Sequence, residues 1–332
     1  MAKTSWLEFL EKTGAYMTEG GNLVFGREID ESKAARDATI ISPLTHLSVA
    51  GFSGDDAKTY LHNLLTSDIK NLGVDACQYS AWCSPKGRML ANFVLYRDRG
   101  AYRALLSADL LATVLKRLRM YVLRSKVDLS DESDAVALIG ISGPDASEIL
   151  RAATLPLPEN GTAIFDEGTL IRLEDRRYIV ALSTVAAEQI WKKLDGKATP
   201  VGCAAWQWLD IRAGTPWITK ATEEKFVPQM LGFEKIDGVS FTKGCYPGQE
   251  IVARSQYLGR LKRHIYRLHG RTPIHMGDAV YSAPKSACGI LACAAPSPEG
   301  GYDALGVLLD EAAQAGEIRS EDGLLLDSIE AV

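Results

Sequence analysis

One cysteine of the chain lies among residues that change the reactivity of a thiol. The segment 241–260 reads FTKGCYPGQEIVARSQYLGR and places Lys243 two residues before Cys245. Pro247 suits the first turn of a helix, where its missing N–H costs nothing, so we expect Cys245 just before a helix N-terminus. A helix dipole and a lysine charge both lower a thiol pKa and make the thiolate more reactive. The segment therefore predicts a reactive thiol at Cys245 with Lys243 as its activator.

The same segment is basic, although the chain as a whole is acidic. Residues 241–263 hold five basic side chains and one acidic one, a local charge of +4 in a chain of net charge −5. This asymmetry predicts a ligand with carboxylates, or an anionic partner surface. Two plainer interpretations stay open, because a cysteine beside glycine also suits a tight loop and basic residues also form solvated helix faces. The charged residues are Lys243, Glu250, Arg254, Arg260, Lys262 and Arg263.

The composition indicates a globular protein with more than one domain. A length of 332 residues with 46% apolar side chains is enough for two or three compact units. No apolar run approaches the ~20 residues of a membrane helix, and the N-terminus lacks the apolar core of a secretory signal. We therefore expect a cytoplasmic protein with no membrane contact. Charge of mixed sign argues against direct binding of nucleic acid.

The cysteines and histidines do not form a metal-binding pattern. The six cysteines include no C-x-x-C pair, and the five histidines are scattered along the chain. Such sparse cysteines are typical of reduced thiols rather than a disulfide scaffold. We expect no zinc or iron site within this chain.

A short internal repeat predicts an α+β body. VAGFSGDDAKTYLHNLL (49–65) resembles LIGISGPDASEILRAA (138–153), and each reads as a strand, a Ser-Gly turn and a helix. We expect Ser53 and Ser142 to act as helix N-caps and the glycines to allow the sharp turn. Between the repeats, DACQYSAWC and MLANFVLYR read as strands joined by the turn SPKGR. From about residue 264, short runs split by Gly, Pro and Asp predict a small all-β barrel.

A tryptophan in WQWLDIRAG is the other candidate binding residue. Trp206 and Trp208 stand two residues apart, and an indole ring can stack on a flat heterocycle. Aromatic side chains are more often part of a core, so the spacing alone leaves both interpretations open.

Several of these segments resemble a known family. KGCYPGQE resembles the K-G-C-Y-x-G-Q-E motif of the YgfZ family, whose members bind folate and are related to the T-protein (aminomethyltransferase) of the glycine cleavage system. Three further segments, YLHNLLTSDI, CSPKGRMLANFVLYR and IRAGTPWITKATEEKFVPQ, are similar to other motifs of this family. The likeness runs from about residue 40 to 265, with a β-rich tail after it.

The resemblance implies a T-protein-like fold with ferredoxin-like α+β parts and a C-terminal β-barrel around a central folate pocket. We place the folate-binding α+β region at residues 1–260, with one subdomain at about 45–130 and the remainder as another, and the barrel at 261–332. The resemblance implies tetrahydrofolate or a one-carbon derivative as ligand. It also implies iron–sulfur enzymes or assembly proteins as partners, and indirect support of tRNA modification.

The resemblance also assigns site residues one by one. Its folate-contacting Trp falls on Trp206, which favours stacking for that ring, and a second Trp position falls near Leu47, where no aromatic stands. Arg212 stands in IRAG where folate-binding relatives usually have Glu, so the pterin is held differently here or folate binding is weakened or lost. The motif residues carried over are Lys243, Cys245, Tyr246, Gly248, Gln249 and Glu250, and we add Arg254 as a contact for the folate tail or a partner.

One departure bears on catalysis. The catalytic Asp of the T-protein corresponds to Ala91 or Asn92 in MLANF, so the carboxylate that aminomethyl transfer needs is absent. Our leading hypothesis is a folate-binding accessory protein for iron–sulfur protein assembly or repair. The alternatives are a folate-dependent one-carbon transferase or demethylase, and a scaffold that has lost folate binding.

Overall fold

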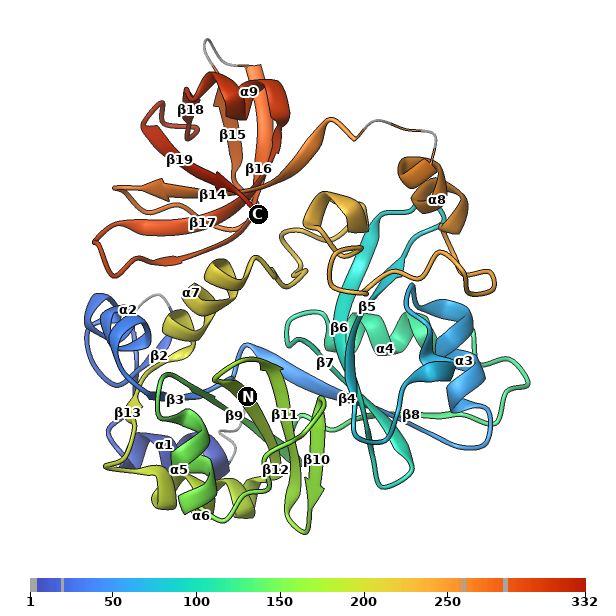
Figure 1. Cartoon of the computed structure of the whole chain (residues 1–332), viewed down its shortest axis with the longest axis vertical. Coiled ribbons are helices and arrows are strands. Elements are labelled where there is room, and N and C mark those ends of the chain that lie inside the picture. The colour runs from blue at the N-terminus through green and yellow to red at the C-terminus, as the bar shows by residue number, and fades with distance from the viewer. Residues whose placement is uncertain (1–4, 19–20, 258, 260, 283–285) are drawn as a thin grey trace. The chain divides into compact units, whose positions relative to one another are not determined.

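The structure is a computed structural model, and it describes residues 5–18, 21–257, 259, 261–282 and 286–332. The chain forms two compact units, each made of three segments, whose elements are labelled in Figure 1. The first unit holds residues 1–57, 72–78 and 94–206, and the second holds residues 58–71, 79–93 and 207–332. The domain boundary expected between residues 260 and 261 stays a prediction.

The first unit is built on a six-stranded sheet of strand order β10-β11-β12-β9-β3-β13. Strand β13 runs parallel to β3, and the other neighbours are antiparallel. Residues of β9 and β12 are buried along almost their whole length, as expected for strands covered on both faces. The strands are β3 (Ile40–Pro43), β9 (Val136–Ser142), β10 (Thr162–Phe165), β11 (Gly168–Glu174), β12 (Arg177–Ser183) and β13 (Thr199–Pro200).

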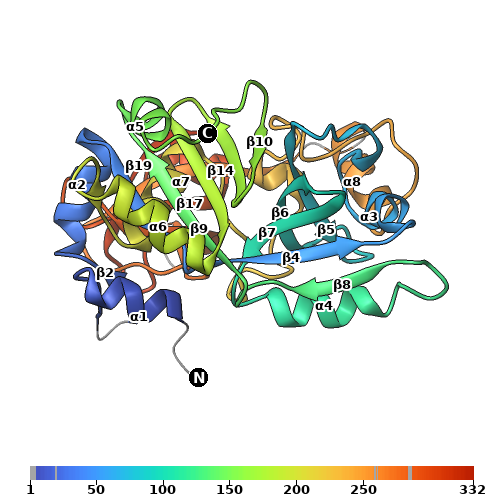
Figure 2. The same ribbon diagram turned by 90° about the horizontal axis from the view of Figure 1, so that it is seen from below.

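Three helices pack against this sheet and complete its apolar core, and Figure 2 shows α1 and α6 lying next to one another. Trp6 of α1 meets Trp191 of α6 edge to face, with ring centroids 5.8 Å apart, a geometry that adds about 1 kcal/mol to the burial of both rings. Helix α6 begins after Ser183, whose hydroxyl accepts a hydrogen bond from Ala186 N. The helices are α1 (Ser5–Lys12), α5 (Ala146–Ala152) and α6 (Thr184–Leu194).

A second sheet has the order β5-β6-β7-β4-β8. Within the first unit, Asp98 at the end of β6 is buried and forms an ion pair with Arg103 of β7. Arg103 Nε also donates to Glu132 at 2.8 Å, and Thr169 of β11 donates to Asp98 at 3.2 Å, so the buried carboxylate is partnered on several sides. The strands are β4 (Leu47–Ser53), β5 (Cys77–Cys83), β6 (Met89–Asp98), β7 (Ala101–Ser107) and β8 (Asp128–Asp131).

The predicted repeat corresponds to two strand–turn–helix pairs, β4 followed by α3 (Ala57–Leu64) and β9 followed by α5. Gly54 and Gly143 make the turns with φ of +105° and +131°. The expected capping by serine is wrong, because Ser53 and Ser142 end their strands. Asp145 is the N-cap of α5, and its backbone N–H donates to Thr39 Oγ1 at 2.9 Å.

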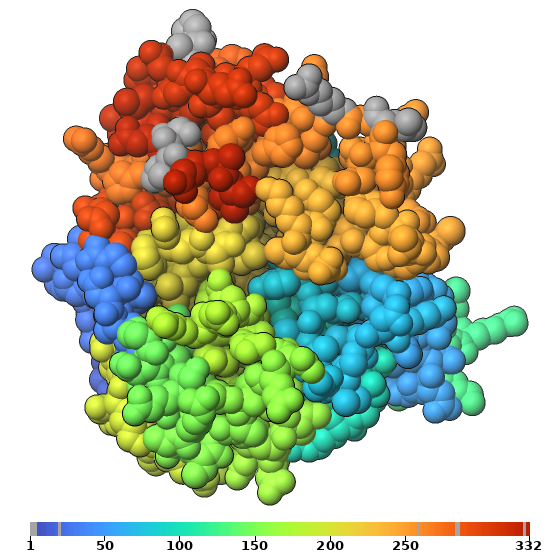
Figure 3. Space-filling model, viewed as in Figure 1, coloured from blue at the N-terminus to red at the C-terminus, as the bar shows by residue number. Residues whose placement is uncertain are grey.

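The C-terminal residues of the second unit form the predicted barrel. It is closed in the order β14-β17-β16-β15-β18-β19 around an apolar core that includes Leu268, Leu291 and Leu308. In the space-filling view of Figure 3, the described residues of the barrel are coloured orange to red. The elements are β14 (Arg263–Gly270), β15 (Ala279–Ser282), β16 (Ser286–Pro296), β17 (Tyr302–Leu309), α9 (Asp310–Ala315), β18 (Ile318–Arg319) and β19 (Leu325–Ala331).

The remaining elements are short or connect the sheets. They are β1 (Tyr16–Met17), β2 (Leu23–Val24), α2 (Glu28–Asp37), the 3-10 turn η1 (Ile69–Asn71), α4 (Leu111–Arg119), α7 (Cys203–Ala213), the 3-10 turn η2 (Pro228–Leu231) and α8 (Gln249–Tyr257). Among the residues that the structure describes, no helix has the length and apolar character needed to span a bilayer.

We expect Gly143→Ala to destabilise the protein strongly. A Cβ at this position would lie 2.5 Å from both Ala38 O and Thr39 Cα, in addition to the strain of a φ of +131°. Denaturant unfolding should show a loss of roughly 2–4 kcal/mol. Gly100→Ala is the matched control, because Gly100 also has a positive φ, +86°, but no atom within 4 Å of its Cβ position. Equal losses in the two variants would contradict the steric explanation.

Candidate functional site

The KGCYPGQE loop leads directly into α8, but the helix begins later than expected. Its first residue is Gln249, and Gly248 before it has a left-handed φ of +81°. Pro247 therefore lies outside the helix, and the prediction that it occupies the first turn is wrong. The left-handed glycine ends the loop and turns the chain into the helix.

Lys243 is buried, and its ammonium group caps the end of α3. The Nζ atom donates hydrogen bonds to the carbonyl oxygens of His62, Leu65 at 2.5 Å and Ser67 at 2.9 Å. Helix C-termini leave such carbonyls without intrahelical partners and carry a partial negative charge, so a cation is favourable there. Burial lowers the pKa of Lys243 to about 8, while the carboxylate of Asp68 opposes that shift. The activation of Cys245 by Lys243 stays a prediction.

Tyr246 and Gly248 fix the other side of the loop. The ring of Tyr246 is buried 5.3 Å from the Lys243 ammonium, and burial raises the pKa of its hydroxyl. A Cβ at Gly248 would lie 2.4 Å from Ser84 O and 2.8 Å from Gly87 Cα. The loop thus contacts the backbone of the SPKGR turn between β5 and β6, and only glycine allows this approach.

The segment FVPQ contacts both α8 and β6. Gln229 Nε2 donates to Val252 O of α8 at 2.6 Å. Phe226 O accepts a hydrogen bond from Met89 N, the first residue of β6, at 2.8 Å. Three segments that the sequence singled out separately therefore meet within the second unit: the β5–β6 turn, FVPQ and the KGCYPGQE loop.

Cys245 is exposed, and the other five cysteines of the chain are buried or half-buried. Burial raises the pKa of Cys77 to about 11 and that of Cys83 to about 12, which leaves those thiols protonated. The fixed loop therefore presents the most accessible thiol of the chain. Glu250 and Arg254 are exposed on α8. Arg260, expected beside them, lies outside the described residues.

Asn92 is one of the two residues, with Ala91, at which the resemblance places the catalytic carboxylate of the T-protein. Its side chain is buried, donates to Pro216 O at 3.1 Å and accepts from Ile218 N at 2.7 Å. Both ends of the amide are thus occupied in holding the loop after α7. The neighbouring Ala91 is fully buried and has no polar group to contribute.

A second group of candidate residues lies in the first unit around Trp206. The ring is fully buried, and the guanidinium of Arg177 lies 4.7 Å from its centroid. A Cβ at Gly140 would lie 2.4 Å from the ring, so glycine makes room for the indole. We call Trp206, Arg177 and His46 the Trp206 cluster. Stacking of Trp206 on a ligand stays a prediction.

His46 belongs to this cluster and was missed by the sequence interpretation. Burial, helped by the charge of Arg177, lowers the pKa of His46 to about 3, so the imidazole is neutral. Both ring nitrogens of His46 and Nε1 of Trp206 are buried without a hydrogen-bond partner among the described residues. Buried polar atoms nearly always have partners, so this group has hydrogen-bonding capacity that the protein itself leaves unused. The one sequence signal for His46 was the family's second Trp position, which falls near the adjacent Leu47.

Leu47 and Arg212, the two residues that depart from the family pattern, lie in different elements. Leu47 is buried at the start of β4, where it pairs with Ser107 of β7. Arg212 is exposed in the last turn of α7, and its carbonyl oxygen accepts a hydrogen bond from Arg267 at 2.7 Å. No group of three or more His, Cys, Asp or Glu side chains in the described ranges is arranged to hold a metal ion.

These features define a protein of the glycine cleavage T-protein fold. The chain matches the structure of glycine cleavage system aminomethyltransferase T from Bartonella henselae with a TM-score of 0.74, at 20% identity, over 100% of this chain and 98% of that one. The family model described as the GCVT N-terminal domain matches residues 8–157.

Relatives of higher sequence identity show which family of this fold the chain belongs to. The chain is 36% identical to the tRNA-modifying protein YgfZ of Yersinia pseudotuberculosis serotype O:1b (strain IP 31758), over 70% of this chain and 71% of that protein. It is 34% identical over the same shares to the protein of that name from Cronobacter sakazakii (strain ATCC BAA-894). The chain belongs to the YgfZ family, as its motifs indicated.

We expect Lys243→Met to destabilise the second unit, because three carbonyl groups lose their donor. Thermal unfolding should show a loss of about 2–4 kcal/mol, the cost of leaving buried acceptors unpaired. In the unsubstituted protein, the NMR signal of Lys243 Cε should titrate near pH 8, whereas exposed lysines titrate near ~10.4.

Lys86→Met is the control for this experiment, because Lys86 is exposed in the β5–β6 turn and makes no hydrogen bond or ion pair with the described residues. Its stability should change little. A stability of Lys243→Met equal to that of the control would show that the carbonyl contacts contribute nothing.

Proposed function

We propose that this protein binds a reduced folate and serves as an accessory protein in the assembly or repair of iron–sulfur proteins, through which it supports tRNA modification. Membership of the YgfZ family supports this role, because its relatives are named tRNA-modifying proteins. The observation that carries the folate part is the Trp206 cluster, which has buried hydrogen-bonding atoms without partners in the described part of the chain.

The residues of this cluster fit a pterin. A neutral imidazole offers one donor and one acceptor, and the indole N–H offers a further donor. The neutral state of His46 matters, because an imidazolium would have donors only. His46 would thus supply the acceptor for the pterin N–H edge that Arg212 cannot supply. When bound, tetrahydrofolate provides the nitrogen atoms that carry a one-carbon unit.

The proposed role of Arg177 is to position the ring of Trp206, not to bind the ligand itself. Its guanidinium is buried, lies over the indole and donates to Glu174 at 3.0 Å. This ion pair fixes the orientation of the guanidinium and therefore of the ring beneath it. Tyr246, Gly248, Gln249, Glu250, Arg254 and Leu47 remain proposed contacts of the folate or of a partner.

Cys245 is the proposed point of contact with the partner protein. Its thiol would accept or deliver a one-carbon or sulfur species, or touch a cluster briefly during transfer. The exposure of Cys245 and the rigid attachment of its loop support this role. A folate-dependent aminomethyl transferase is less well supported, because Asn92 is occupied structurally and supplies no carboxylate.

We expect tetrahydrofolate to bind the reduced protein with micromolar affinity, about −8 kcal/mol, in anaerobic calorimetry. His46→Phe and Trp206→Phe each remove hydrogen-bonding atoms but keep an aromatic ring, and each should weaken binding about tenfold. His275→Phe, at an exposed histidine of the barrel, should bind as the parent does. Absence of binding heat, together with an unchanged melting temperature, would favour a scaffold without folate.

We expect Cys245→Ala to fail to restore iron–sulfur enzyme activity in a strain that lacks the protein. Its melting temperature should stay unchanged, because the side chain is exposed. Cys293→Ala, at a half-buried cysteine of the barrel, should restore activity. Full restoration by Cys245→Ala would refute the thiol role and leave folate binding untouched. Turnover of a methylamine donor with tetrahydrofolate would instead favour a transferase.

A further inference from the structure

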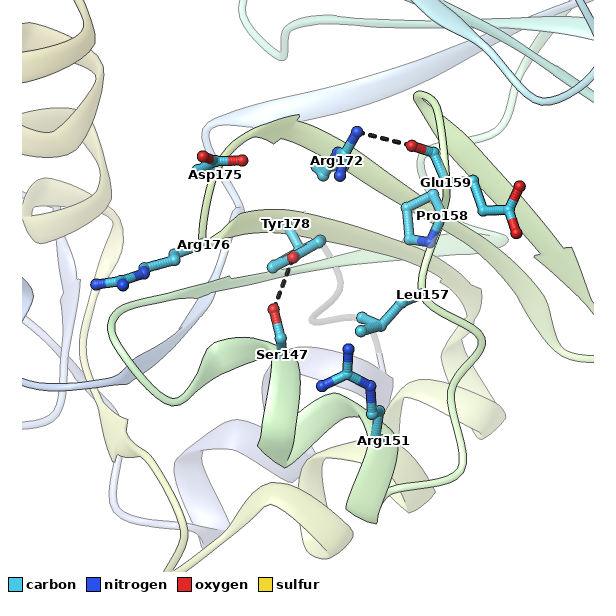
Figure 4. A pocket seen from close by; sticks show the side chains of 9 residues that line it. All are labelled: Ser147, Arg151, Leu157, Pro158, Glu159, Arg172, Asp175, Arg176 and Tyr178. Atoms are coloured by element: carbon cyan, nitrogen blue, oxygen red, sulfur yellow. Dashed lines mark hydrogen bonds between the residues drawn. The ribbon is translucent and has the colours of Figure 1, made fainter.

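The first unit contains a hollow of about 480 Å³ that shares no residue with the Trp206 cluster or the KGCYPGQE loop. Figure 4 shows its lining side chains, which come from α5, the segment after it, and the strands β11 and β12. This volume is in the range of small-molecule sites.

The base of the hollow is aromatic and apolar. Tyr178 and Pro158 are buried, and Leu157 is half-buried beside them. The hydroxyl oxygens of Tyr178 and Ser147 lie 2.8 Å apart and share a hydrogen bond (Figure 4). The base therefore offers a flat ring, an apolar wall and a pair of hydroxyl groups.

Two arginines approach this base from different elements. Arg172 of β11 is half-buried, and its Nη2 donates to Glu159 O at 2.8 Å, which fixes its guanidinium at the edge of the hollow. Arg151 of α5 reaches the hollow from the opposite side (Figure 4). Its guanidinium makes no hydrogen bond or ion pair with any residue that the structure describes. Both groups thus retain free N–H donors.

The charged groups at the rim do not neutralise these arginines. The carboxylate of Glu159 points away from the hollow, and so does the guanidinium of Arg176 (Figure 4). Asp175 stands at the tip of the β11–β12 turn, and no ion pair joins it to Arg151 or Arg172 in the described structure. The side chains that face the interior therefore carry an excess of positive charge.

The segment after α5 makes the hollow a rigid one. Thr154 has a left-handed φ of +63°, and Pro156 and Pro158 follow it within four residues. Proline fixes φ and reduces the freedom of the unfolded chain. A site that is already formed loses little conformational entropy when a ligand binds.

We propose that this hollow binds a small organic phosphate monoester. Its phosphoryl group would lie between Arg151 and Arg172, and its ring would lie against Tyr178 and Leu157. Guanidinium groups match the oxygen spacing of a phosphate and bind it with paired hydrogen bonds. A phosphate monoester carries close to two negative charges at neutral pH, and the two guanidinium groups balance them. A ligand with a single carboxylate would leave one guanidinium charge unbalanced. The site is independent of the proposed folate role.

Calorimetry with adenosine 5′-monophosphate as the probe tests this site. The nucleotide should bind, inorganic phosphate should compete with it, and adenosine should bind at least about tenfold more weakly. Arg151→Gln and Arg172→Gln should each weaken nucleotide binding about tenfold. Tetrahydrofolate binding should be the same in both variants as in the parent.

Arg124→Gln is the matched control, because Arg124 is exposed in the same unit and makes no hydrogen bond or ion pair with described residues. It should bind the nucleotide as the parent does. Arg151 is also exposed, so its variant stays folded and keeps the test decisive. The proposal fails if neither the nucleotide nor inorganic phosphate binds at millimolar concentration. It also fails if adenosine matches the nucleotide, or if Arg124→Gln weakens binding as much as Arg151→Gln.

Discussion

The buried ammonium group of Lys243 is the contact on which the candidate thiol site depends. It joins the KGCYPGQE loop to three carbonyl groups in and just after the last turn of α3. An amine on a long flexible chain costs free energy to bury, and the three carbonyl oxygens offset that cost. Lys243 and Tyr246 stand on either side of Cys245 in the loop, and both are buried. The loop is therefore held on both sides of this exposed thiol.

The buried side chain of Asn92 has a structural role in this chain. Asn92 uses both ends of its amide to hold the loop after α7. An amide can donate and accept at once, whereas an ionised carboxylate can only accept. Function depends on the residues of a site rather than on the fold that carries it.

Local patterns in the sequence were enough to predict the two strands of the repeat, the strands β5 and β6 with their turn, and the barrel, because each of them depends on residues close in the chain. Family motifs supplied the T-protein-like fold. The orientation of Lys243 was not predictable, since its nearest carbonyl partner in sequence is 176 residues away. His46 was missed because a single histidine has no periodic pattern, and only the burial of both ring nitrogens sets it apart. Ser53 and Ser142 were misread as caps because strand ends and helix starts favour the same residues.

The composition of the second unit from three separate segments also affects how it folds. Residues 58–71 and 79–93 leave the ribosome long before residue 207, where the remainder of the unit begins. Until then, the end of α3 has no ammonium cap and the β5–β6 turn has no loop against it. Contacts across such separations form late and make folding slow. The contacts that hold the KGCYPGQE loop therefore form only after residue 243 has been synthesised, across separations of 176 to 181 residues.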